Sequence, residues 1–480
     1  MTAMAILGEL ERKGVKPTRL AIDSRTVTPG DVFVAMPGHR VDGRSFAADA
    51  VARGAAAVLY EAGAPLALPV PTVAVSGLAA LAGEIAHLVY GRPSERLWVA
   101  GVTGTNGKTS VSQWIAQAMS FLGRKCAVVG TLGSGFPGQM IESVNTTPDA
   151  ISLHRSLAGF VEQDAVACAM EVSSIGIDEG RVNGVSFDVA VFTNLTRDHL
   201  EYHGSMEAYA VAKEKLFDWP GLRAAVVNLD DVVGGHLARR LAGRLPTIGY
   251  TLTGRVGGDR VLVARDIAMS GSGLAFTVDG VRIEAPVVGR FNVANLMAVI
   301  GALLVADERP EDIAAVLRRI EPPPGRMQPV GGVGQPLVVV DYAHTPDALE
   351  KALGTLRDTA TARGGRLVCV FGCGGDRDSG KRPLMGAMAE RLADRVLLTS
   401  DNPRNEDPMA IIENVAKGMK RRPAIEPDRA AAIRQALREA AAGDVILLAG
   451  KGHEPYQEIA GVRRPFSDLA LAREVLELQP

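Results

Sequence analysis

The sequence predicts an α/β protein with three domains and mostly parallel sheets. Short apolar runs typical of strands alternate with helix-like segments, which is the pattern of packed layers of strands and helices. The chain has 480 residues, more than one hydrophobic core usually organises. Two breaker segments, 91–97 and the proline-rich 321–328, divide it into predicted domains of residues 1–95, 96–325 and 326–480.

The individual strands follow from short apolar runs that end in turn residues. In the first domain these runs are DVFVAMPG and AAAVLYE, and in the second they are WVAGVTG, AVACAMEVSS, DVAVFTNL and AAVVNLD. The third domain has PLVVVDYAH, RLVCVFGCGG, RVLLTS and DVILLAG, which are almost continuously apolar. Strands that are buried on both faces of a parallel sheet have this composition, so we expect a Rossmann-like third domain.

Composition excludes several classes of protein. Lys and Arg total 52 and Asp and Glu total 54, a net charge of −2, so we expect neither a nucleic-acid partner nor a membrane-surface partner. Four cysteines are too few for a disulfide framework, and no second Cys or His pair completes a zinc set with Cys369 and Cys373. We therefore expect a cytoplasmic protein, without a signal peptide, that acts as a monomer on small molecules.

A glycine-rich turn between a predicted strand and a predicted helix indicates a phosphate site. The segment GVTGTNGKTS supplies Gly104, Gly107, Lys108 and Thr109. Such glycines let backbone N–H groups converge on phosphate oxygens, while the lysine reaches the terminal phosphates and the hydroxyl holds Mg²⁺. The strict P-loop pattern requires glycine where this chain has Val102, so the loop is a variant.

Polar residues after two further strands are candidates for the metal side of this site. Glu171 ends one strand, where a magnesium carboxylate is expected. Beyond the next strand the chain carries a polar group consisting of Asn194, Asp198, His199, Glu201 and His203. No Asn-Lys pair typical of guanine recognition occurs, although a non-enzymatic nucleotide switch stays open as an alternative.

An ordered set of motifs resembles the Mur ligases, the ATP-dependent amide-forming enzymes of peptidoglycan precursor synthesis. The motifs include TGTNGKT, NTTPD, MEVSS, NLTRDHLEYH, PPGRMQ, DYAHTPD, DNPRNEDP and AGKGHE. They are most similar to the members that add the third amino acid of the peptide. The resemblance implies a small UDP-binding first domain, a central P-loop ATPase domain and a third domain that delivers the amino acid.

In that family a carboxylate is phosphorylated by ATP and an amine then displaces the phosphate. The resemblance therefore implies that meso-diaminopimelate is joined to UDP-N-acetylmuramoyl-L-alanyl-D-glutamate. It implies that ATP is bound by Gly104, Thr105, Asn106, Gly107, Lys108, Thr109, Ser110, Asn295, Arg326 and Asp341. The implied metal residues are Thr109, Glu171, His199 and Lys213, and the implied catalytic residues are Lys108, Lys213 and His199.

Lys213 is expected to carry a carbamate formed from CO₂, as the lysine at this place does in the family. The reaction replaces a cation by an anionic group with two oxygens that can support a second Mg²⁺. The amine must lose its proton first, which a desolvated site would favour. Lys215 is the neighbouring alternative.

The resemblance also assigns the two remaining substrates. The UDP-muramoyl dipeptide is expected to contact Ser24, His39, Arg40, Val41, Asn145, Thr146, Thr147, Ser173, Arg181 and Glu179. At Glu179 the family pattern has glutamine, so this position departs from it. The amino acid is expected to contact Arg377, Asp401, Asn402, Pro403, Arg404, Gly450 and Glu454.

Arg404 is the residue expected to select the amino acid. Meso-diaminopimelate differs from lysine by one distal carboxylate, which a planar guanidinium binds through two parallel N–H donors. Pro403 stiffens the backbone before it. Lysine would leave the guanidinium unpaired, and such a site rejects the analogue by roughly 10⁴-fold. An L-lysine-adding ligase, another Mur ligase and a folylpolyglutamate synthase are the alternatives.

Overall fold

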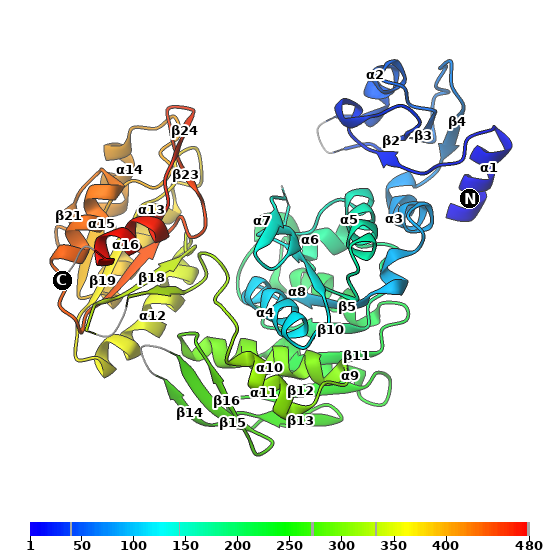
Figure 1. Ribbon diagram of the computed structural model, residues 1–480. Coiled ribbons are helices and arrows are strands. Elements are labelled where there is room, and N and C mark those ends of the chain that lie inside the picture. Colours follow the sequence, from blue (N-terminus) through cyan, green and yellow to red (C-terminus); the bar gives the residue numbers. More distant parts are fainter. Residues whose placement is uncertain (39–40, 144, 270–272, 332–333, 478–480) are drawn as a thin grey trace. The chain divides into compact units, whose positions relative to one another are not determined.

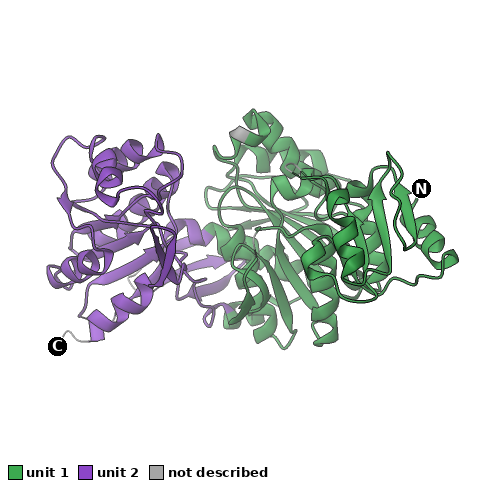
Figure 2. Cartoon of the chain, turned by 90° about the horizontal axis from the view of Figure 1, so that it is seen from above, with its two compact units in different colours: residues 1–264, 294–316 green, residues 265–293, 317–480 purple. Residues whose placement is uncertain are grey.

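The computed structural model describes residues 1–38, 41–143, 145–269, 273–331 and 334–477. Its chain forms two compact units, drawn in two colours in Figure 2. Unit 1 comprises residues 1–264 and 294–316, and unit 2 comprises residues 265–293 and 317–480. Each unit is built from mostly parallel α/β layers (Figure 1), so the predicted fold class is confirmed.

Unit 1 begins with a small parallel sheet of strand order β1-β2-β3-β4. Its strands are β1 (Leu20–Ala21), β2 (Val32–Ala35), β3 (Ala57–Glu61) and β4 (Thr72–Val75). The helices of this part are α1 (Ala3–Arg12), α2 (Ala47–Ala52) and α3 (Leu78–Val89). All four residues of β2 are buried, as expected for a strand covered on both faces.

The larger sheet of unit 1 has the order β13-β12-β11-β10-β5-β9-β6-β7-β8. The parallel strands are β5 (Trp98–Thr103), β6 (Cys126–Gly130), β9 (Ala167–Glu171), β10 (Val189–Phe192), β11 (Ala224–Asn228), β12 (Thr247–Thr251) and β13 (Arg260–Val263). The strands β7 (Gly133–Phe136) and β8 (Gln139–Ile141) add an antiparallel edge. Because β9 lies on one side of β5 and β10 on the other, the connections reverse direction at β5, where α/β sheets bind ligands.

Helices connect these strands. They are α4 (Lys108–Phe121), α5 (Ala150–Glu162), α6 (Ser174–Asp178), α7 (Leu200–His203), α8 (Met206–Glu214) and α9 (Val232–Leu241). The helices α10 (Arg290–Val305) and α11 (Pro310–Leu317) follow, and each includes residues of both units. The segment 91–97, read as a linker, contains a short 3₁₀ turn with Pro93 and Ser94 buried, and Ser94 Oγ accepts a hydrogen bond from the Ser186 amide.

Unit 2 contains a six-stranded sheet of order β17-β18-β22-β19-β20-β21. Its strands are β17 (Gln328–Val330), β18 (Leu337–Asp341), β19 (Leu367–Phe371), β20 (Arg395–Leu398), β21 (Ala424–Ile425) and β22 (Val445–Ala449). All pairs are parallel except β17 with β18. The helices are α12 (Pro346–Ala362), α13 (Lys381–Leu392), α14 (Pro408–Ala416), α15 (Arg429–Arg438) and α16 (Asp468–Glu477).

Two further elements of unit 2 were not predicted. One is an antiparallel sheet of β14 (Arg265–Met269), β15 (Leu274–Val278) and β16 (Val281–Ala285). The other is the hairpin of β23 (Tyr456–Ile459) and β24 (Val462–Pro465). The β15–β16 and β23–β24 turns each contain a glycine with positive φ, at Gly280 and Gly461. All of these strands except β15 carry two charged or amide side chains in four or five residues, so they do not stand out as apolar runs.

Candidate functional site

The glycine turn after β5 is shaped by close approach of other segments. Gly104 and Gly107 both have positive φ, which disfavours a side chain. A Cβ at Gly104 would lie 1.9 Å from Thr193 Oγ1, and one at Gly107 would lie 2.4 Å from Asn295 Oδ1. The turn therefore requires glycine at both positions, and it brings the predicted Asn295 to the start of α4.

The polar segment after β10 fixes this turn from the side. The Asn106 amide donates to Asn194 Oδ1 at 3.1 Å, and Asn194 Nδ2 donates to the Asn106 carbonyl at 3.0 Å. Thr105 Oγ1 donates to the Thr196 carbonyl and accepts from the Thr196 amide. Hydrogen bonds thus join the glycine turn to the polar segment after β10.

Two lysines converge on one carbonyl oxygen of the turn. Lys108 Nζ donates to the carbonyls of Gly104 and Thr105, each at 2.9 Å, and Lys213 Nζ donates to the Gly104 carbonyl at 2.8 Å. Lys213 is 1% exposed, and its Nζ lies 4.4 Å from the centre of the Tyr209 ring. Burial, followed by the charge of Lys108, lowers the pKa of Lys213 well below its ordinary value.

The neighbouring lysine has a different environment. Lys215 is exposed and forms an ion pair with Asp178 at 2.5 Å. Of the two lysines, Lys213 is therefore the one that contacts the glycine turn and has the desolvated amine that carbamylation would require.

Glu171, at the end of β9, contacts the residue that follows Lys108. It is 1% exposed, and its Oε2 accepts from Thr109 Oγ1 at 3.1 Å. The Thr131 amide donates to Oε1 at 2.8 Å, and Thr131 Oγ1 donates to Oε2 at 3.1 Å. A hydroxyl and a carboxylate at this spacing are oxygen ligands of the kind that Mg²⁺ prefers, so the residues fit the metal. Thr131 was not predicted, although it directly follows an apolar run.

His199 lies near the same turn but in a more open position. Its backbone has φ of +51°, its Nε2 is 3.6 Å from Asp198 Oδ2, and its ring meets the Tyr209 ring edge-on at 6.2 Å. Its neighbour His203 contacts Ser174 Oγ through Nε2 at 2.9 Å. Within the described part of the chain, no group of three or more His, Cys, Asp and Glu side chains is arranged to hold a metal.

The residues expected to hold the muramoyl peptide form one network beside Glu171. Thr147 Oγ1 donates to the Glu171 carbonyl at 3.0 Å and to Ser173 Oγ at 3.1 Å. Thr146 Oγ1 lies 3.1 Å from Thr131 Oγ1. Arg181 Nη1 donates to the Thr147 carbonyl at 3.0 Å. Thr147 therefore joins these residues directly to Glu171.

Glu179 does not present an unbalanced charge. Arg181 donates to Glu179 Oε2 through Nε, at 2.7 Å, and through Nη2.

Asn145 is exposed and lines a cavity of about 420 Å³ together with Ser134 and Ser152.

The N-terminal contacts are only partly described. Ser24 is buried in a 3₁₀ turn, and Val41 is exposed. The predicted His39 and Arg40 lie outside the described residues.

In unit 2, the backbone holds Arg404 in a fixed place. The Arg404 amide donates to the Glu458 carbonyl at 3.0 Å, and the Ala460 amide donates to the Arg404 carbonyl at 2.6 Å. Arg404 has φ of +51°, and its Nη1 donates to the Gly375 carbonyl at 2.6 Å. The side chain is half-buried, so the guanidinium stands at the rim of the site with one nitrogen anchored.

Arg377 approaches the same place from the loop after β19. A Cβ added at Gly374 would lie 3.0 Å from Arg404 Nη1 and 3.7 Å from Arg377 Cγ, so the two arginines flank Gly374. Pro403 is buried behind Arg404, in agreement with a stiffened backbone.

A buried polar cluster lies beside these arginines. Lys451 Nζ donates to Asn402 Oδ1 and Glu454 Oε2, each at 3.0 Å, and Asn402 Nδ2 donates to the same Glu454 oxygen at 2.7 Å. Lys451 Nζ also lies 3.9 Å from Asp401 Oδ1, and a Cβ at Gly450 would lie 2.5 Å from Asp401 Oδ2. The structure brings together Asp401, Asn402, Gly450 and Glu454, and adds Lys451, which the sequence analysis missed inside the AGKGHE motif.

Arg326 and Asp341 are also neighbours in unit 2. Asp341 ends β18 and accepts from the amides of Met327 and Ala343 at 2.8 and 2.9 Å. Burial raises the pKa of Asp341, while the charge of Arg326 opposes the increase. The Arg326 guanidinium carbon lies 5.3 Å from the centre of the Tyr342 ring. The pair and the aromatic ring are consistent with a nucleotide-facing surface.

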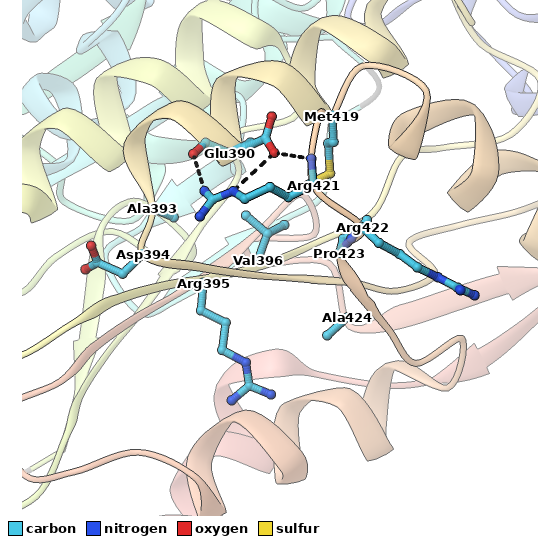
Figure 3. A pocket seen from close by; sticks show the side chains of 10 residues that line it. All are labelled: Glu390, Ala393, Asp394, Arg395, Val396, Met419, Arg421, Arg422, Pro423 and Ala424. Carbon is cyan, nitrogen blue, oxygen red and sulfur yellow. Dashed lines mark hydrogen bonds and ion pairs between the residues drawn. The ribbon is translucent and has the colours of Figure 1, made fainter.

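One surface pocket of unit 2, with a cavity of about 260 Å³, contains none of the predicted residues (Figure 3). Of its two acids, Glu390 faces Arg421 and accepts from the amides of Lys420 and Arg421, while Asp394 pairs with Arg357. Because these groups satisfy one another, the pocket is not a candidate for the reaction. No helix within the described ranges has both the length and the apolar character that a membrane crossing needs.

Comparison with known proteins matches three successive parts of the chain to family models. These are "Mur ligase family, catalytic domain" at residues 17–90, "Mur ligase middle domain" at 102–303 and "Mur ligase, glutamate ligase domain" at 325–452.

Similar proteins cover nearly the whole chain. A UDP-N-acetylmuramoyl-L-alanyl-D-glutamate--2,6-diaminopimelate ligase of Chromobacterium violaceum is 53% identical and covers 97% of this chain and 96% of its own. A solved structure with the same enzyme name is 36% identical, with a TM-score of 0.70 and coverage of 97% and 95%. The MurF ligase of Thermotoga maritima in complex with ADP is 19% identical, with a TM-score of 0.64 and coverage of 96% and 98%, which shows a shared fold.

Proposed function

This chain belongs to the Mur ligase family, and from that premise we propose that it joins meso-diaminopimelate to UDP-N-acetylmuramoyl-L-alanyl-D-glutamate at the expense of ATP. The enzyme is a ligase of peptidoglycan precursor synthesis, and the carboxylate is activated as an acyl phosphate. The observation that carries the proposal is the guanidinium of Arg404, anchored beside the buried cluster of Asp401, Asn402 and Glu454.

The phosphate turn of unit 1 is proposed to bind ATP and to neutralise its charge. Lys108 exchanges its two carbonyl acceptors for the terminal phosphates, and the first turn of α4 directs backbone N–H groups toward them. Thr109 and Glu171 hold Mg²⁺, with His199 on the open side. Bound Mg²⁺ supplies positive charge to the phosphoryl oxygens as the carboxylate attacks.

Lys213 is proposed to become a carbamate. Burial and the nearby Lys108 favour its neutral amine, which is the form that reacts with CO₂. The carbamate replaces repulsion from Lys108 by attraction and supplies two oxygens for a second Mg²⁺. Asn295, Arg326 and Asp341 are proposed as further nucleotide contacts.

The acceptor peptide is proposed to lie against the network of Thr146, Thr147, Ser173 and Arg181, because this network leads directly to Glu171. Asn145 and Glu179 adjoin it, and the uridine diphosphate is assigned to the segment of Ser24 and Val41. In this proposal the peptide carboxylate would lie beside the glycine turn, because Thr147 joins the network directly to Glu171.

Arg404 and Arg377 are proposed to bind the distal carboxylate of meso-diaminopimelate, and Asp401, Asn402 and Glu454 its polar amino-acid end. The second candidate is a ligase that adds L-lysine. Because lysine has no distal carboxylate, this candidate does not account for two arginines beside Gly374.

The domains are proposed at residues 1–95, 96–325 and 326–480. The chain is proposed to act as a monomer in the cytoplasm, and its four buried free cysteines agree with a reducing compartment.

One assay tests this function. The purified chain is incubated with ATP, Mg²⁺, the UDP-linked dipeptide and either meso-diaminopimelate or L-lysine, while phosphate release and product mass are measured. The proposal requires one phosphate per amide formed and product with meso-diaminopimelate. Equal use of L-lysine would refute the assignment of Arg404, and phosphate release without any amine would refute the ligase.

A further inference from the structure

A fully buried ion pair lies beneath the amino-acid site of unit 2. Arg429 is the first residue of α15 and Asp468 is the first residue of α16. The two side chains have 0% exposure, and the guanidinium meets the carboxylate through two bonds, Nε to Oδ1 at 2.8 Å and Nη2 to Oδ2 at 2.6 Å. Neither residue belongs to the set assigned to the reaction.

The guanidinium also binds the ends of two strands. Arg429 Nη2 donates to the carbonyl of Ala449, the last residue of β22, at 3.0 Å. Arg429 Nη1 donates to the carbonyl of Ser400, just beyond β20, at 3.3 Å. The next residues along the chain are Gly450 and Asp401, which are assigned to the amino acid. One side chain therefore holds both loops at the peptide units that precede the site.

The same guanidinium affects the charge of the site. Asp401 is buried, and its burial raises its pKa, while the charges of Arg429 and Lys451 lower it. Glu454 and Asp468 act in the opposite direction with smaller effects. Arg429 thus favours the ionised carboxylate that an incoming ammonium group needs.

Fold stability alone is a weak explanation for this pair. Taking two charges out of water costs as much as their attraction returns, so well-packed apolar residues of similar size usually replace a buried ion pair without loss of stability. The surroundings suit such a replacement, because Ala432, Ile433 and Leu471 line the apolar core between the two helices and the sheet. Apolar residues would not hold the two carbonyl oxygens.

We propose that Arg429 and Asp468 are positioning residues for the amino-acid site: the carboxylate orients the guanidinium, which sets the spacing between the loop of Asp401 and the loop of Gly450. This inference rests on the proposed function, because it takes those loops as the binding site of the diamino acid.

The test is the double variant Arg429→Met/Asp468→Leu, with KM measured separately for meso-diaminopimelate, ATP and the UDP-linked dipeptide. We expect KM for meso-diaminopimelate to rise at least 10-fold, while the other two KM values stay within twofold. The double variant should stay folded at the assay temperature, although two carbonyls lose a donor. Arg429→Lys should also raise this KM, because an ammonium cannot bind the carboxylate through two parallel bonds and hold both carbonyls.

The matched control is Arg366→Met. Arg366 pairs with Asp444 at the amino ends of β19 and β22, with Nη2 to Oδ2 at 2.8 Å, at the opposite end of the same sheet. All three KM values should remain unchanged in this variant.

Three results would overturn the proposal. They are an unchanged KM for meso-diaminopimelate in the double variant, an equal rise of all three KM values, and failure of the double variant to fold, which would assign the pair to stability. If the parent itself formed no amide, the proposed function would fail instead. Amide hydrogen exchange at residues 400–402 and 449–451 would then still test the pair, since exchange there should be faster in the double variant.

Discussion

The shared carbonyl acceptor of Lys108 and Lys213 has a measurable consequence for catalysis. Each Nζ lies less than 3 Å from the Gly104 oxygen, at 2.9 and 2.8 Å, so the two nitrogens are within about 6 Å of each other. At an effective dielectric constant of about 20, Lys108 would repel a positive charge on Lys213 at that distance by about 3 kcal/mol, which helps to favour the neutral amine. A carbamate on Lys213 would convert this repulsion into attraction of similar size.

Replacing Lys213 by alanine should therefore slow the reaction. Loss of about 3 kcal/mol of electrostatic support corresponds to roughly a hundredfold decrease in kcat. The variant also leaves space for a small anion, so acetate or propionate at millimolar concentration should restore part of the rate. The assay is phosphate release at saturating substrates, with and without the short carboxylate.

The control is Lys215→Ala, which removes an exposed ion pair with Asp178 and should leave kcat within twofold. The reasoning would be refuted if Lys213→Ala kept the parental kcat. It would also be refuted if the variant were inactive and no short carboxylate restored any activity, or if mass spectrometry of the enzyme kept under CO₂ showed the adduct on another lysine.

The remaining predictions concern selectivity, nucleotide binding and pH. Arg404→Ala should raise KM for meso-diaminopimelate by about 10²-fold and remove most of the preference over L-lysine. Replacement of the exposed Arg464 by alanine is the control and should change neither quantity. An unchanged preference in Arg404→Ala would disprove the role of Arg404. Lys108→Met should abolish detectable ATP binding in calorimetry without lowering the melting temperature, and normal ATP affinity would contradict the phosphate site. Burial lowers the pKa of His154 to about 4, so the folded state resists protonation of this side chain. Between pH 7 and pH 5, the free energy of unfolding should fall by about 2 kcal/mol more in the parent than in His154→Gln. Equal decreases in the two proteins would contradict this prediction.

The sign of the pH effect follows from the direction of the shift. His154 has a lower pKa in the folded state than in the unfolded chain, so below the ordinary value of 6.5 the unfolded chain binds more protons. Stability is therefore lost as the pH falls from about 6.5 toward 4. Its Nε2 contacts the Asn183 carbonyl at 2.9 Å, and the ring of His87 lies 5.3 Å away.

The parts of the fold that the sequence predicts are those with local causes. We could identify the apolar strands of both large sheets because a strand that is buried on both faces consists mostly of apolar residues. We could identify the turn of Gly104 and Gly107 because positive φ favours glycine. The antiparallel sheet β14–β16 was not predicted, since each strand has only five residues and β14 and β16 each carry two charged side chains.

The candidate site likewise contains residues that the sequence identifies and residues that it does not. Arg404 lies in the loop after β20, and the apolar run before it marks that loop in the sequence. Thr131, Lys451 and Arg429 were missed, because their importance comes from partners distant in the chain: Glu171, Asn402 and Asp468. Sequence alone also could not separate Lys213 from Lys215 by burial, which is decided by how α8 packs.

The most direct test of the central claim is the fate of a labelled oxygen. The dipeptide substrate is prepared with ¹⁸O in the carboxylates of its glutamate, and the phosphate released during amide formation is analysed by mass spectrometry. If the carboxylate attacks the γ-phosphate and the amine then displaces phosphate, each phosphate carries one ¹⁸O. Unlabelled phosphate, released while amide is formed, would contradict the account.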